Sequence, residues 1–437
     1  FQKKSAALCP GKAKCGDDEK GADYVKSNKE NLFGLSDGAA DKDWVLYAAT
    51  PDPSMMRNRL VFDLYKKMRP DEWGVNSMYV ELVVNGEYRG VYVLMDKITN
   101  NANRVNIKNE NGFIVKFDKT DVVDRVENTE GDQKTFATSR TGTKNSSNGN
   151  ESYGTCIDQR FEIEYPEKED IQLWDAFYGN VQQRFEDFET ALANKDYATV
   201  RTLIDYDSWA DWFILTELAK NQDGFRASCI FVYDGDKIEA RPLWDQELSF
   251  NNGTRVKHGI DSPEGLIITT SSVYNDAFYP PFWFIGHTDK NQSSTITGGL
   301  LNDPCFVSLV KQKWATYQSG VCSPDAIGAM VTDYNDELGN AINREAARWP
   351  YTEAVRGTTT DGDYIGYYNF TGNKPEGNSS TASSFDASKN AITAWIAGRS
   401  TALTAGSGLG KAINDLNGEA LIFTISPSSV ETTPWKQ

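Results

Sequence analysis

The chain has 437 residues and a formal net charge of −17, from 62 Asp and Glu residues against 45 Lys and Arg residues. A chain of this length buries roughly three quarters of its unfolded surface, so a sizeable core is expected without disulfide staples. The negative field argues against a nucleic-acid partner, because it repels phosphates and no local basic patch offsets it. No apolar run of about 18 residues occurs, so no transmembrane segment is predicted.

The six cysteines contain no C-x-x-C pair, so a zinc ribbon or a redox dithiol has little support. Local disulfides Cys9–Cys15 and Cys305–Cys322 are predicted, with reduced buried thiols as the alternative. Six N-x-[ST] sequons favour a secreted or cell-surface (envelope) protein, with glycosylation as an added expectation. They lie at Asn145, Asn150, Asn252, Asn291, Asn369 and Asn378. The oligomeric state stays open.

Residues 1–120 are predicted to form a sheet-rich lobe with one helix. The helix begins after Asp52-Pro53-Ser54 and continues with apolar residues at helical spacing. Arg57 is expected to pair with Asp52 or Asp63, its neighbours along the helix. Two β-rich runs, 79–84 and 88–95, flank Asn85-Gly86, a hairpin signal because both turn residues take positive φ. Further strands are predicted at 104–107 and 112–117.

Asp, Asn, Ser, Thr and Gly dominate residues 121–156, which predicts a mobile insert or surface loop between two lobes. Residues 157–405 are predicted to form a mostly helical lobe that contains the acidic site. Its expected helices are 173–193, 197–204, 208–220, 306–317, 326–349 and 387–403, with a hairpin of strands 229–233 and 237–241. In the third of these helices, Asp207 or Ser208 is the expected cap. Residues 406–437 are predicted to be a linker and a terminal strand near 419–425. This strand could finish the second lobe or begin another domain.

Two acidic residues of the second lobe, Asp223 and Asp245, lie 22 residues apart. Each of them, with the loop that carries it, is one acidic station of the candidate site. Asp223 follows helix 208–220, and Asp245 follows the predicted hairpin. Carboxylates from separate loops can meet at one metal or one hydroxyl, as phosphoryl transfer requires. Only His258 and His287 occur, and neither H-E-x-x-H nor G-x-S-x-G is present, so carboxylates must carry the chemistry. The order of acid, hairpin and acid matches protein kinases, although Ser228 stands where kinases have a metal-binding Asn.

Several short motifs share one order along the chain. They are Phe1-Gln2-Lys3-Lys4-Ser5, Trp44-Val45-Leu46, Asp52 with Arg57-Asn58, Val84-Asn85-Gly86-Glu87-Tyr88-Arg89-Gly90-Val91-Tyr92, Asn221-x-Asp223-Gly224, Pro242-Leu243-Trp244-Asp245, Lys313-Trp314 and Trp395-Ile396-x-x-Arg399. In this order they resemble the CotH kinase family, the spore coat protein H-like atypical protein kinases. The resemblance implies an α+β, divergent protein-kinase-like fold with two lobes. It also implies ATP, Mg²⁺ (or Mn²⁺) and a protein substrate phosphorylated on Ser or Thr.

The resemblance further implies roles for the acidic residues. Asp223 corresponds to the catalytic-loop Asp, and Asp245 to the metal-binding Asp. Glu247 can join Asp245 on the metal, since Mg²⁺ accepts any carboxylate, and Ser228 is the third candidate ligand.

Nucleotide contacts are implied nearer the N-terminus. Lys3 or Lys4 is the phosphate-contacting lysine, and strand alternation does not choose between them, because successive residues face opposite sides. Asp96, in Met95-Asp96-Lys97, is expected at the adenine hinge, where backbone groups recognise the base.

Two other function classes stay open. A catalytically decayed CotH-like extracellular structural or adhesive module is suggested by Ser228 and by Gln246-Glu247 after Asp245. A carboxylate-pair glycosidase is suggested by the acidity and the many aromatic residues, although a lysine, a hairpin and an acid pair in this order have no role there. Asp223 taken alone also fits a purely structural helix-ending turn.

Overall fold

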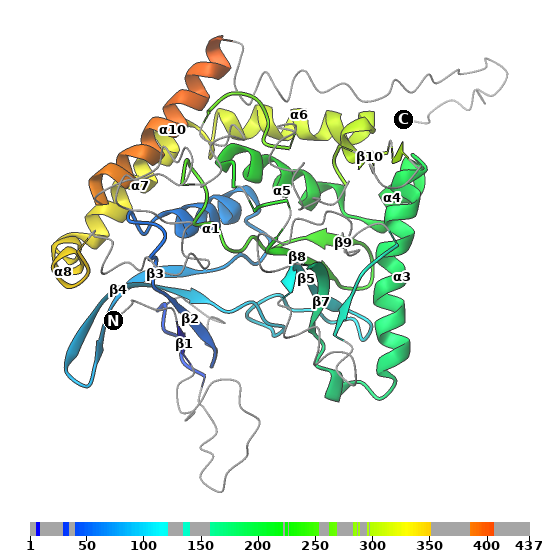
Figure 1. Ribbon diagram of the computed structural model, residues 1–437, viewed down its shortest axis with the longest axis horizontal. Helices are drawn as coiled ribbons and strands as arrows, with labels where there is room; N and C mark the ends of the chain where they lie inside the picture. Colours follow the sequence, from blue (N-terminus) through cyan, green and yellow to red (C-terminus); the bar gives the residue numbers. More distant parts are fainter. Residues whose placement is uncertain are drawn as a thin grey trace, which may run out of the picture.

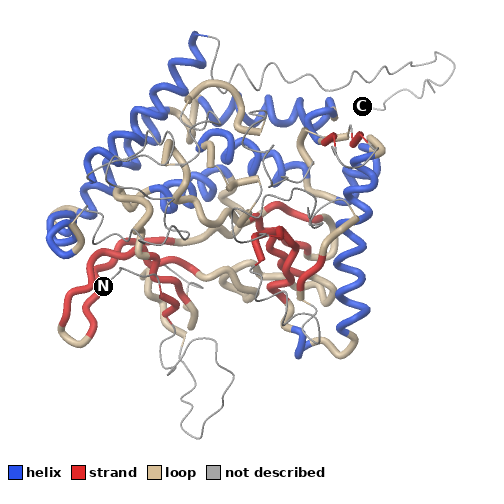
Figure 2. The backbone as a smooth tube through the Cα atoms, viewed as in Figure 1, coloured by secondary structure: helices blue, strands red, loops and turns tan. Residues whose placement is uncertain are grey.

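The computed structural model describes residues 6–8, 29–34, 40–120, 134–139, 158–221, 223–225, 227–252, 262–268, 283–285, 287–288, 295–296, 298–350 and 385–405. Over these residues the chain is an α+β protein with eight α-helices and antiparallel sheets of four, five and two strands (Figures 1 and 2). None of the helices described combines the length and apolar character that crossing a bilayer requires.

The four-stranded sheet contains the predicted hairpin. Its strands, in the order β1-β2-β4-β3, are β1 (Ala6–Leu8), β2 (Trp44–Tyr47), β4 (Glu87–Asp96) and β3 (Ser77–Val84). Asn85 and Gly86 take φ values of 52° and 81°, which confirms the turn predicted for them. Helix α1 (Arg57–Met68) contacts β3 and buries most of its apolar side chains, as the helical spacing predicted.

The five-stranded sheet has the order β6-β7-β5-β8-β9. Its strands are β5 (Phe113–Thr120), β6 (Thr135–Phe136), β7 (Asp158–Tyr165), β8 (Cys229–Tyr233) and β9 (Ile238–Ala240). The strand predicted at 112–117 therefore exists as β5, but it pairs with β7 and β8 instead of with the N-terminal hairpin. Within the predicted insert, β6 adds a short edge strand whose Phe136 is buried.

The strand predicted at 104–107 is wrong. This segment forms turns and irregular structure, and Asn106 has a φ of 61°. The buried Arg104 side chain pairs with Asp96 and lies 3.1 Å from Asp41. Ion pairs therefore fix this segment where pairing with a strand was expected.

The other helices are α3 (Trp174–Ala193), α4 (Tyr197–Leu203), α5 (Tyr206–Ala219), α6 (Pro304–Gln318), α7 (Pro324–Leu338), α8 (Ala341–Arg348) and α10 (Phe385–Ala405), with short 3₁₀ turns at Lys168–Asp170 and Leu300–Asn302. In the view of Figure 1 most helices lie above the four- and five-stranded sheets, and α3 runs along the side of the five-stranded sheet. The two-stranded sheet pairs β10 (His287–Thr288) with β11 (Thr295–Ile296). The helix predicted at 326–349 is two helices, because the chain turns at Gly339, whose φ is 46°. The cap of α5 is Asp205, which accepts from Ser208 N at 2.8 Å, and not Asp207 or Ser208.

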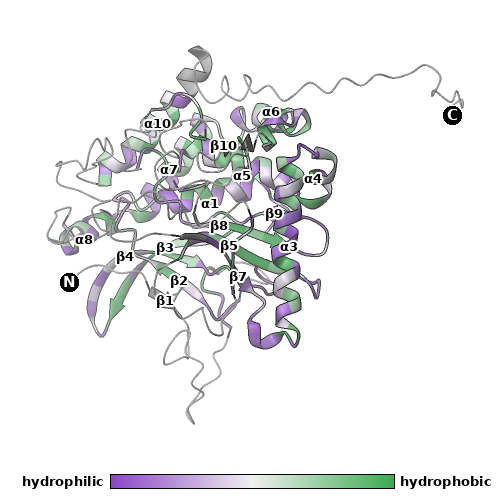
Figure 3. Ribbon diagram, turned by 45° about the vertical axis from the view of Figure 1, so that its right-hand side comes forward, coloured by the Kyte–Doolittle hydropathy of each residue, from purple (hydrophilic) through white to green (hydrophobic). Residues whose placement is uncertain are grey.

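An aromatic core joins the five-stranded sheet to α3 and α5. Phe161 of β7 lies 4.6 Å from Phe185 of α3, and Phe231 of β8 lies 5.4 Å from Trp209 of α5, measured between ring centroids. Such aromatic pairs add about 0.5–1.5 kcal/mol each beyond the area they bury. The hydrophobic colour of β8 beside α5 in Figure 3 marks this interior. The end of α5 and the start of β8 flank the described residues between them, 220–221, 223–225 and 227–228.

The Cys305–Cys322 disulfide prediction is wrong, because both thiols are free. Cys305 lies in the first turn of α6, and Cys322 follows the other end of this 15-residue helix. Such a helix is about 22 Å long, whereas a disulfide needs Cα atoms within about 7 Å. The predicted Cys9–Cys15 pair lies outside the described residues.

The sequon at Asn252 is not available for glycosylation in this fold. Its side chain is buried, and its amide donates to Pro51 O at 2.9 Å and to Glu247 O at 2.7 Å. The other five sequons, and the terminal strand predicted near 419–425, lie outside the described residues.

Helix α8 is fastened to the edge of β4 around a glycine. The buried Glu345 carboxylate accepts from Val91 N at 2.8 Å, and Trp349 Nε1 donates to Arg89 O at 2.7 Å. Between these contacts Gly90 takes a φ of 107°, and a Cβ there would lie 2.8 Å from Trp349 Nε1 and would also contact Glu345 Oε2. Neither space nor backbone conformation at Gly90 admits a side chain.

Gly90→Ala is expected to lower the free energy of unfolding by about 3 kcal/mol, because it combines a strained φ with overlap against α8. Gly86→Ala is the matched control, since its φ is also positive, at 81°, but no atom lies within 4 Å of the added Cβ. It should cost only about 1 kcal/mol. Urea denaturation of both variants measures the difference, and equal losses would contradict the packing of α8 on β4.

Candidate functional site

The first acidic station begins where α5 ends. Lys220 closes the helix in the left-handed conformation, with a φ of 44°. Asp223 N then donates to Asn221 Oδ1 at 3.1 Å, and Ala227 N donates to Asp223 O at 2.9 Å, so Asp223 lies within a compact turn. Its side chain is half-buried and keeps access to solvent.

The second station follows β9. Asp245 has a φ of 49°, and the next backbone N–H, that of Gln246, donates to Asn58 Oδ1 on α1 at 2.6 Å. The buried Gln246 side chain donates to Trp244 O at 2.6 Å. Gln246 therefore serves to shape the loop, while Asp245 on one side and Glu247 on the other are left to face the site.

One buried amide joins the two stations. Asn221 Nδ2 donates to Asp245 O at 3.1 Å and to Gln246 Oε1 at 3.0 Å, while its Oδ1 accepts from Asp223 N. The Asn221 residue is only 1% exposed. The structure thus brings together the two acidic loops that the sequence places 22 residues apart.

Ser228 bridges Asp245 to an acid that the sequence reasoning missed. Its Oγ donates to Asp245 Oδ2 at 2.9 Å and lies 3.5 Å from Asp118 Oδ2 on β5. Ser228, like Asp245, takes a positive φ, at 55°. Non-glycine residues with positive φ are uncommon and cluster at functional sites. The alternation of buried Val115 and Phe117 with polar neighbours on β5 is the signal that could have drawn attention to Asp118.

The acidic residues interact electrostatically. Burial raises the pKa of the Glu247 carboxyl to about 8, and the charges of Asp245 and Asp223 add to the shift. Desolvation by the surrounding protein also raises the pKa of Asp245, to about 6, with contributions from Asp118 and Asp223. Because Asp245 keeps exposed surface, water screens part of this shift.

Glu247 Oε2 is buried and has no hydrogen-bond partner among the residues described. A buried carboxylate oxygen without a donor is costly unless a proton or a cation satisfies it. Across the described ranges, no three His, Cys, Asp or Glu side chains are arranged as a ready metal-binding group. A metal ion bound by Asp245, Glu247 and Ser228 would satisfy Glu247 Oε2, the oxygen that has no donor among the described residues.

Arg57 supports the second station from behind. It forms a buried ion pair with Asp52, the first of the two partners expected for it. Its guanidinium also donates to Ser249 O at 2.9 Å, to Phe250 O at 3.3 Å, and to Ser388 Oγ of α10 at 2.7 Å. The loop after Glu247 is therefore fixed by two helices that are distant in the sequence.

Asp96, the residue expected at the adenine hinge, makes its side-chain contacts with Arg104 and Asn76. The Asp96 side chain is fully buried, pairs with Arg104, and accepts from Asn76 N at 3.0 Å. Burial raises its pKa and Arg104 opposes the shift. Asp96 ends β4, where the chain leaves the four-stranded sheet, so only its backbone would be available for an adenine. Lys3 and Lys4 lie outside the described residues.

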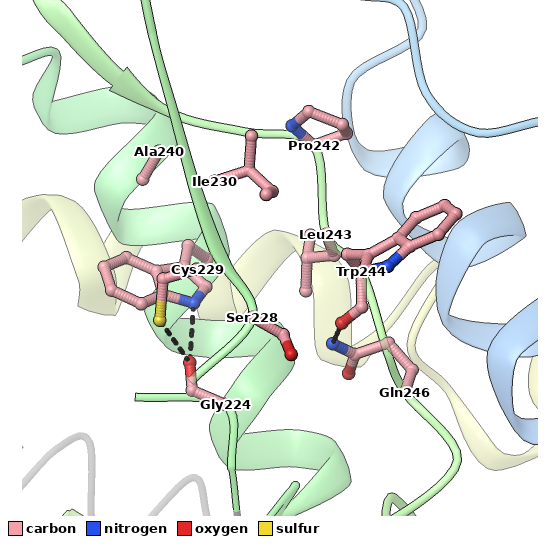
Figure 4. Close-up of a pocket in the computed structure, with 10 residues that line it drawn as sticks. Gly224, Ser228, Cys229, Ile230, Ala240, Pro242, Leu243, Trp244 and Gln246 are labelled. Atoms are coloured by element: carbon pink, nitrogen blue, oxygen red, sulfur yellow. Dashed lines mark hydrogen bonds between the residues drawn. The ribbon is translucent and has the colours of Figure 1, made fainter. Parts of the chain in front are cut away.

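A small pocket separates the two loops (Figure 4). Gly224 and Ser228 line it from the first loop, and Trp244 and Gln246 from the second, with Ile230 of β8 beside them. Trp212 Nε1 donates to Gly224 O at 3.0 Å and holds the first loop against α5. Neighbours of Asp223 and Asp245 in the two loops thus line the pocket, together with residues of β8 and β9.

Comparison with known proteins gives one family. The family model described as "CotH kinase protein" matches residues 2–403. No curated protein matches the chain. The matched range includes both acidic stations and Asp118.

Asn221→Ala is expected to lower the free energy of unfolding by about 3 kcal/mol, because Asp223 N, Asp245 O and Gln246 Oε1 lose their partner together. Asn100→Ala is the control, since that half-buried amide pairs with Ile107 N at 2.7 Å away from the site. It should cost about 1 kcal/mol. A denaturant titration that shows no extra loss for Asn221→Ala would contradict the bridging role.

Glu247 predicts a pH dependence of stability in metal-free buffer. Its pKa is about 8 in the fold and near 4.5 unfolded, so the folded state holds the proton between these values. The stabilisation is complete below about pH 4.5 and is lost as the pH rises through 8. Glu247→Gln keeps the neutral form, so its stability relative to the wild type should rise by roughly 2 kcal/mol between pH 5 and pH 8. Parallel pH profiles for wild type and variant would refute the shift, and Glu167→Gln, at an exposed position, is the control.

Proposed function

Because this chain belongs to the CotH kinase family, we propose that it is a CotH-type atypical protein kinase that transfers the γ-phosphate of ATP to Ser or Thr hydroxyls of a protein substrate. The observation that carries the proposal is the Asn221 amide, which joins Asp223 and Asp245 from separate loops. Such convergence is what phosphoryl transfer needs, since its catalysis is mostly positioning and electrostatics.

Asp223 is proposed as the residue that orients the acceptor hydroxyl and takes its proton. As the hydroxyl oxygen bonds to the γ-phosphorus, the bond to the β–γ bridging oxygen breaks and ADP leaves. Asp223 suits this role because its turn is anchored to α5 and its carboxylate keeps access to solvent. A base held in one geometry contributes typically 10²–10⁴-fold to the rate.

Asp245 and Glu247, with Ser228, are proposed to hold Mg²⁺ or Mn²⁺. The residues fit a hard cation, because Glu247 Oε2 lacks a donor in the described part of the chain and the neighbouring carboxylates raise each other's pKa. A bound divalent cation would supply positive charge against the phosphates. Asn58 and Arg57 keep the loop in place by binding its backbone.

For ATP, Lys3 or Lys4 and the backbone at Asp96 remain the proposed contacts. We propose the corresponding two-lobed organisation, with residues 1–120 as N-lobe, 121–156 as a mobile insert or loop, 157–405 as the helical C-lobe and 406–437 as a linker and a terminal strand. The pairing of β5 with β8 suggests that the end of the first segment contributes to the second lobe. A secreted or cell-surface location is proposed with it.

The second candidate is a CotH-like module that has lost catalysis. Ser228 favours this candidate. It has a hydroxyl where kinases have an amide ligand, and that hydroxyl already donates a hydrogen bond to Asp245. Family membership gives no support to the third alternative, a glycosidase. Activity assays separate the first two candidates.

Asp223→Ala and Asp245→Ala are each expected to reduce autophosphorylation from labelled ATP by at least about 100-fold. Asp245→Ala should also lose the rise in Tm that Mg²⁺-ATP gives the wild type, whereas Asp223→Ala should keep it, because only Asp245 is assigned to binding. Asp187→Ala, on the exposed face of α3, is the control.

Label incorporation that survives both substitutions would refute the assignment of the site. A wild type without incorporation and without a Tm shift would favour the non-catalytic module.

A further inference from the structure

The motif Trp395-Ile396-x-x-Arg399 lies in the second half of α10. Trp395 and Arg399 are four residues apart, so they lie on the same face of the helix, and the Arg399 guanidinium carbon is 5.5 Å from the centroid of the Trp395 ring. Both residues are almost completely buried, with 4% and 1% of their surface exposed. This face of α10 therefore brings two side chains with hydrogen-bond donors into the interior of the protein.

Both side chains bind the end of α5. The last four carbonyl groups of an α-helix have no N–H partner further along the same helix, so other groups must satisfy them. Trp395 Nε1 donates to Leu218 O at 3.1 Å, and the Arg399 guanidinium donates to Glu217 O. Side chains of α10 thus satisfy two carbonyl groups in the last turn of α5.

This last turn leads directly into the first acidic station. Lys220 ends the helix in the left-handed conformation, and the chain reaches Asn221 and Asp223 within the next three residues. Ala219 O, in the same turn, accepts from Phe250 N of the second acidic loop at 2.7 Å. Helix ends fray where their carbonyl groups lack partners. The groups that bind the end of α5 therefore decide in which direction the chain leaves it.

Arg399 also joins a third segment to the end of α5. Its Nη1 donates to Pro263 O at 2.8 Å and to Gly265 O at 3.0 Å. Lys220 Nζ binds the same segment, since it donates to Ser262 O at 2.9 Å. A planar guanidinium has its donors in fixed directions, so one arginine can bind the helix end and this segment together. The position of the Arg399 side chain is therefore fixed by several carbonyl groups.

We propose that Trp395 and Arg399 are positioning residues for phosphoryl transfer, which act by binding the last carbonyl groups of α5 and so fix the turn that carries Asp223. This rests on the proposed function and gives α10 a part in the reaction. Asp223 can accept the proton of the acceptor hydroxyl only when its carboxylate is held in the right place. A displacement of about 1 Å that arises far from the reacting atoms can lower a rate about 100-fold.

Trp395→Phe tests the proposal with a small change, because it removes the indole N–H and keeps an aromatic ring. It should lower the kcat of autophosphorylation, expressed per folded molecule by circular dichroism, at least about tenfold, because Leu218 O loses its donor and the turn at Asp223 loosens. The KM for Mg²⁺-ATP should stay within about twofold of the wild-type value. The reason is that the loop of Asp245 is anchored separately, by Asn58.

Trp314→Phe is the matched control. Trp314 of α6 is also buried, at 2% exposure, but its Nε1 has no hydrogen-bond partner in the part of the chain that the structure describes. The same atoms are removed and no hydrogen bond is lost, so kcat and KM should equal the wild-type values.

Arg399→Lys is the second variant and replaces Trp395→Phe if that protein does not fold. It keeps the charge, but one ammonium does not reproduce the fork of donors that binds Glu217 O and the segment at Pro263 together. Its kcat should also fall at least about tenfold, with the KM for Mg²⁺-ATP unchanged.

Three results would overturn the inference. If the wild type is active and Trp395→Phe matches Trp314→Phe, the bond to Leu218 does not position the site, and the proposed function stands. A rise in KM that accompanies the loss of kcat would show a general loosening of the fold, and therefore a structural role only. A wild type without autophosphorylation would overturn the proposed function and this inference together.

Discussion

The site depends on a single side chain, the amide of Asn221. Its three hydrogen bonds use both ends of the amide, so one residue sets the turn that carries Asp223 and also anchors the backbone of Asp245. Because this amide is buried, water does not compete for these bonds, and the register between the two loops is held firmly. α5 and the β8–β9 hairpin position the ends of the two loops, and Asn221 determines how the loops meet.

Around this amide the protein accepts unfavourable local features. Ser228 and Asp245 have positive φ values, and Glu247 is a half-buried carboxylate beside other acids. Each of these costs of order 1–3 kcal/mol. The surrounding network offsets them: Asn58 and Arg57 bind the backbone of the second loop, and Trp212 binds that of the first. The unfavourable backbone conformations and the crowded acids therefore lie in the two loops, between the helices and strands that hold the loops in place.

Local signals predicted much of this structure. The turn at Asn85-Gly86, the strand 229–233 and the helix at 173–193 follow from turn chemistry and periodicity, which act between near neighbours. Long-range pairing was not accessible in the same way. Asp118 escaped notice because its strand joins β8, more than a hundred residues away, and the Arg104 segment looked like a strand although ion pairs to Asp96 and Asp41 hold it. The two acids were found because each ends a locally recognisable element.

The contact between Arg57 and Ser388 has a consequence for how the protein is made. These residues are 331 positions apart, and the arginine that binds the loop after Glu247 is completed by the first turn of α10. During synthesis the ribosome releases both acidic loops well before it releases α10. A growing chain thus contains every acid of the site while the guanidinium behind that site still lacks its last partner. Contacts of such sequence separation form late, so the site should reach its final shape only after α10 has been synthesised.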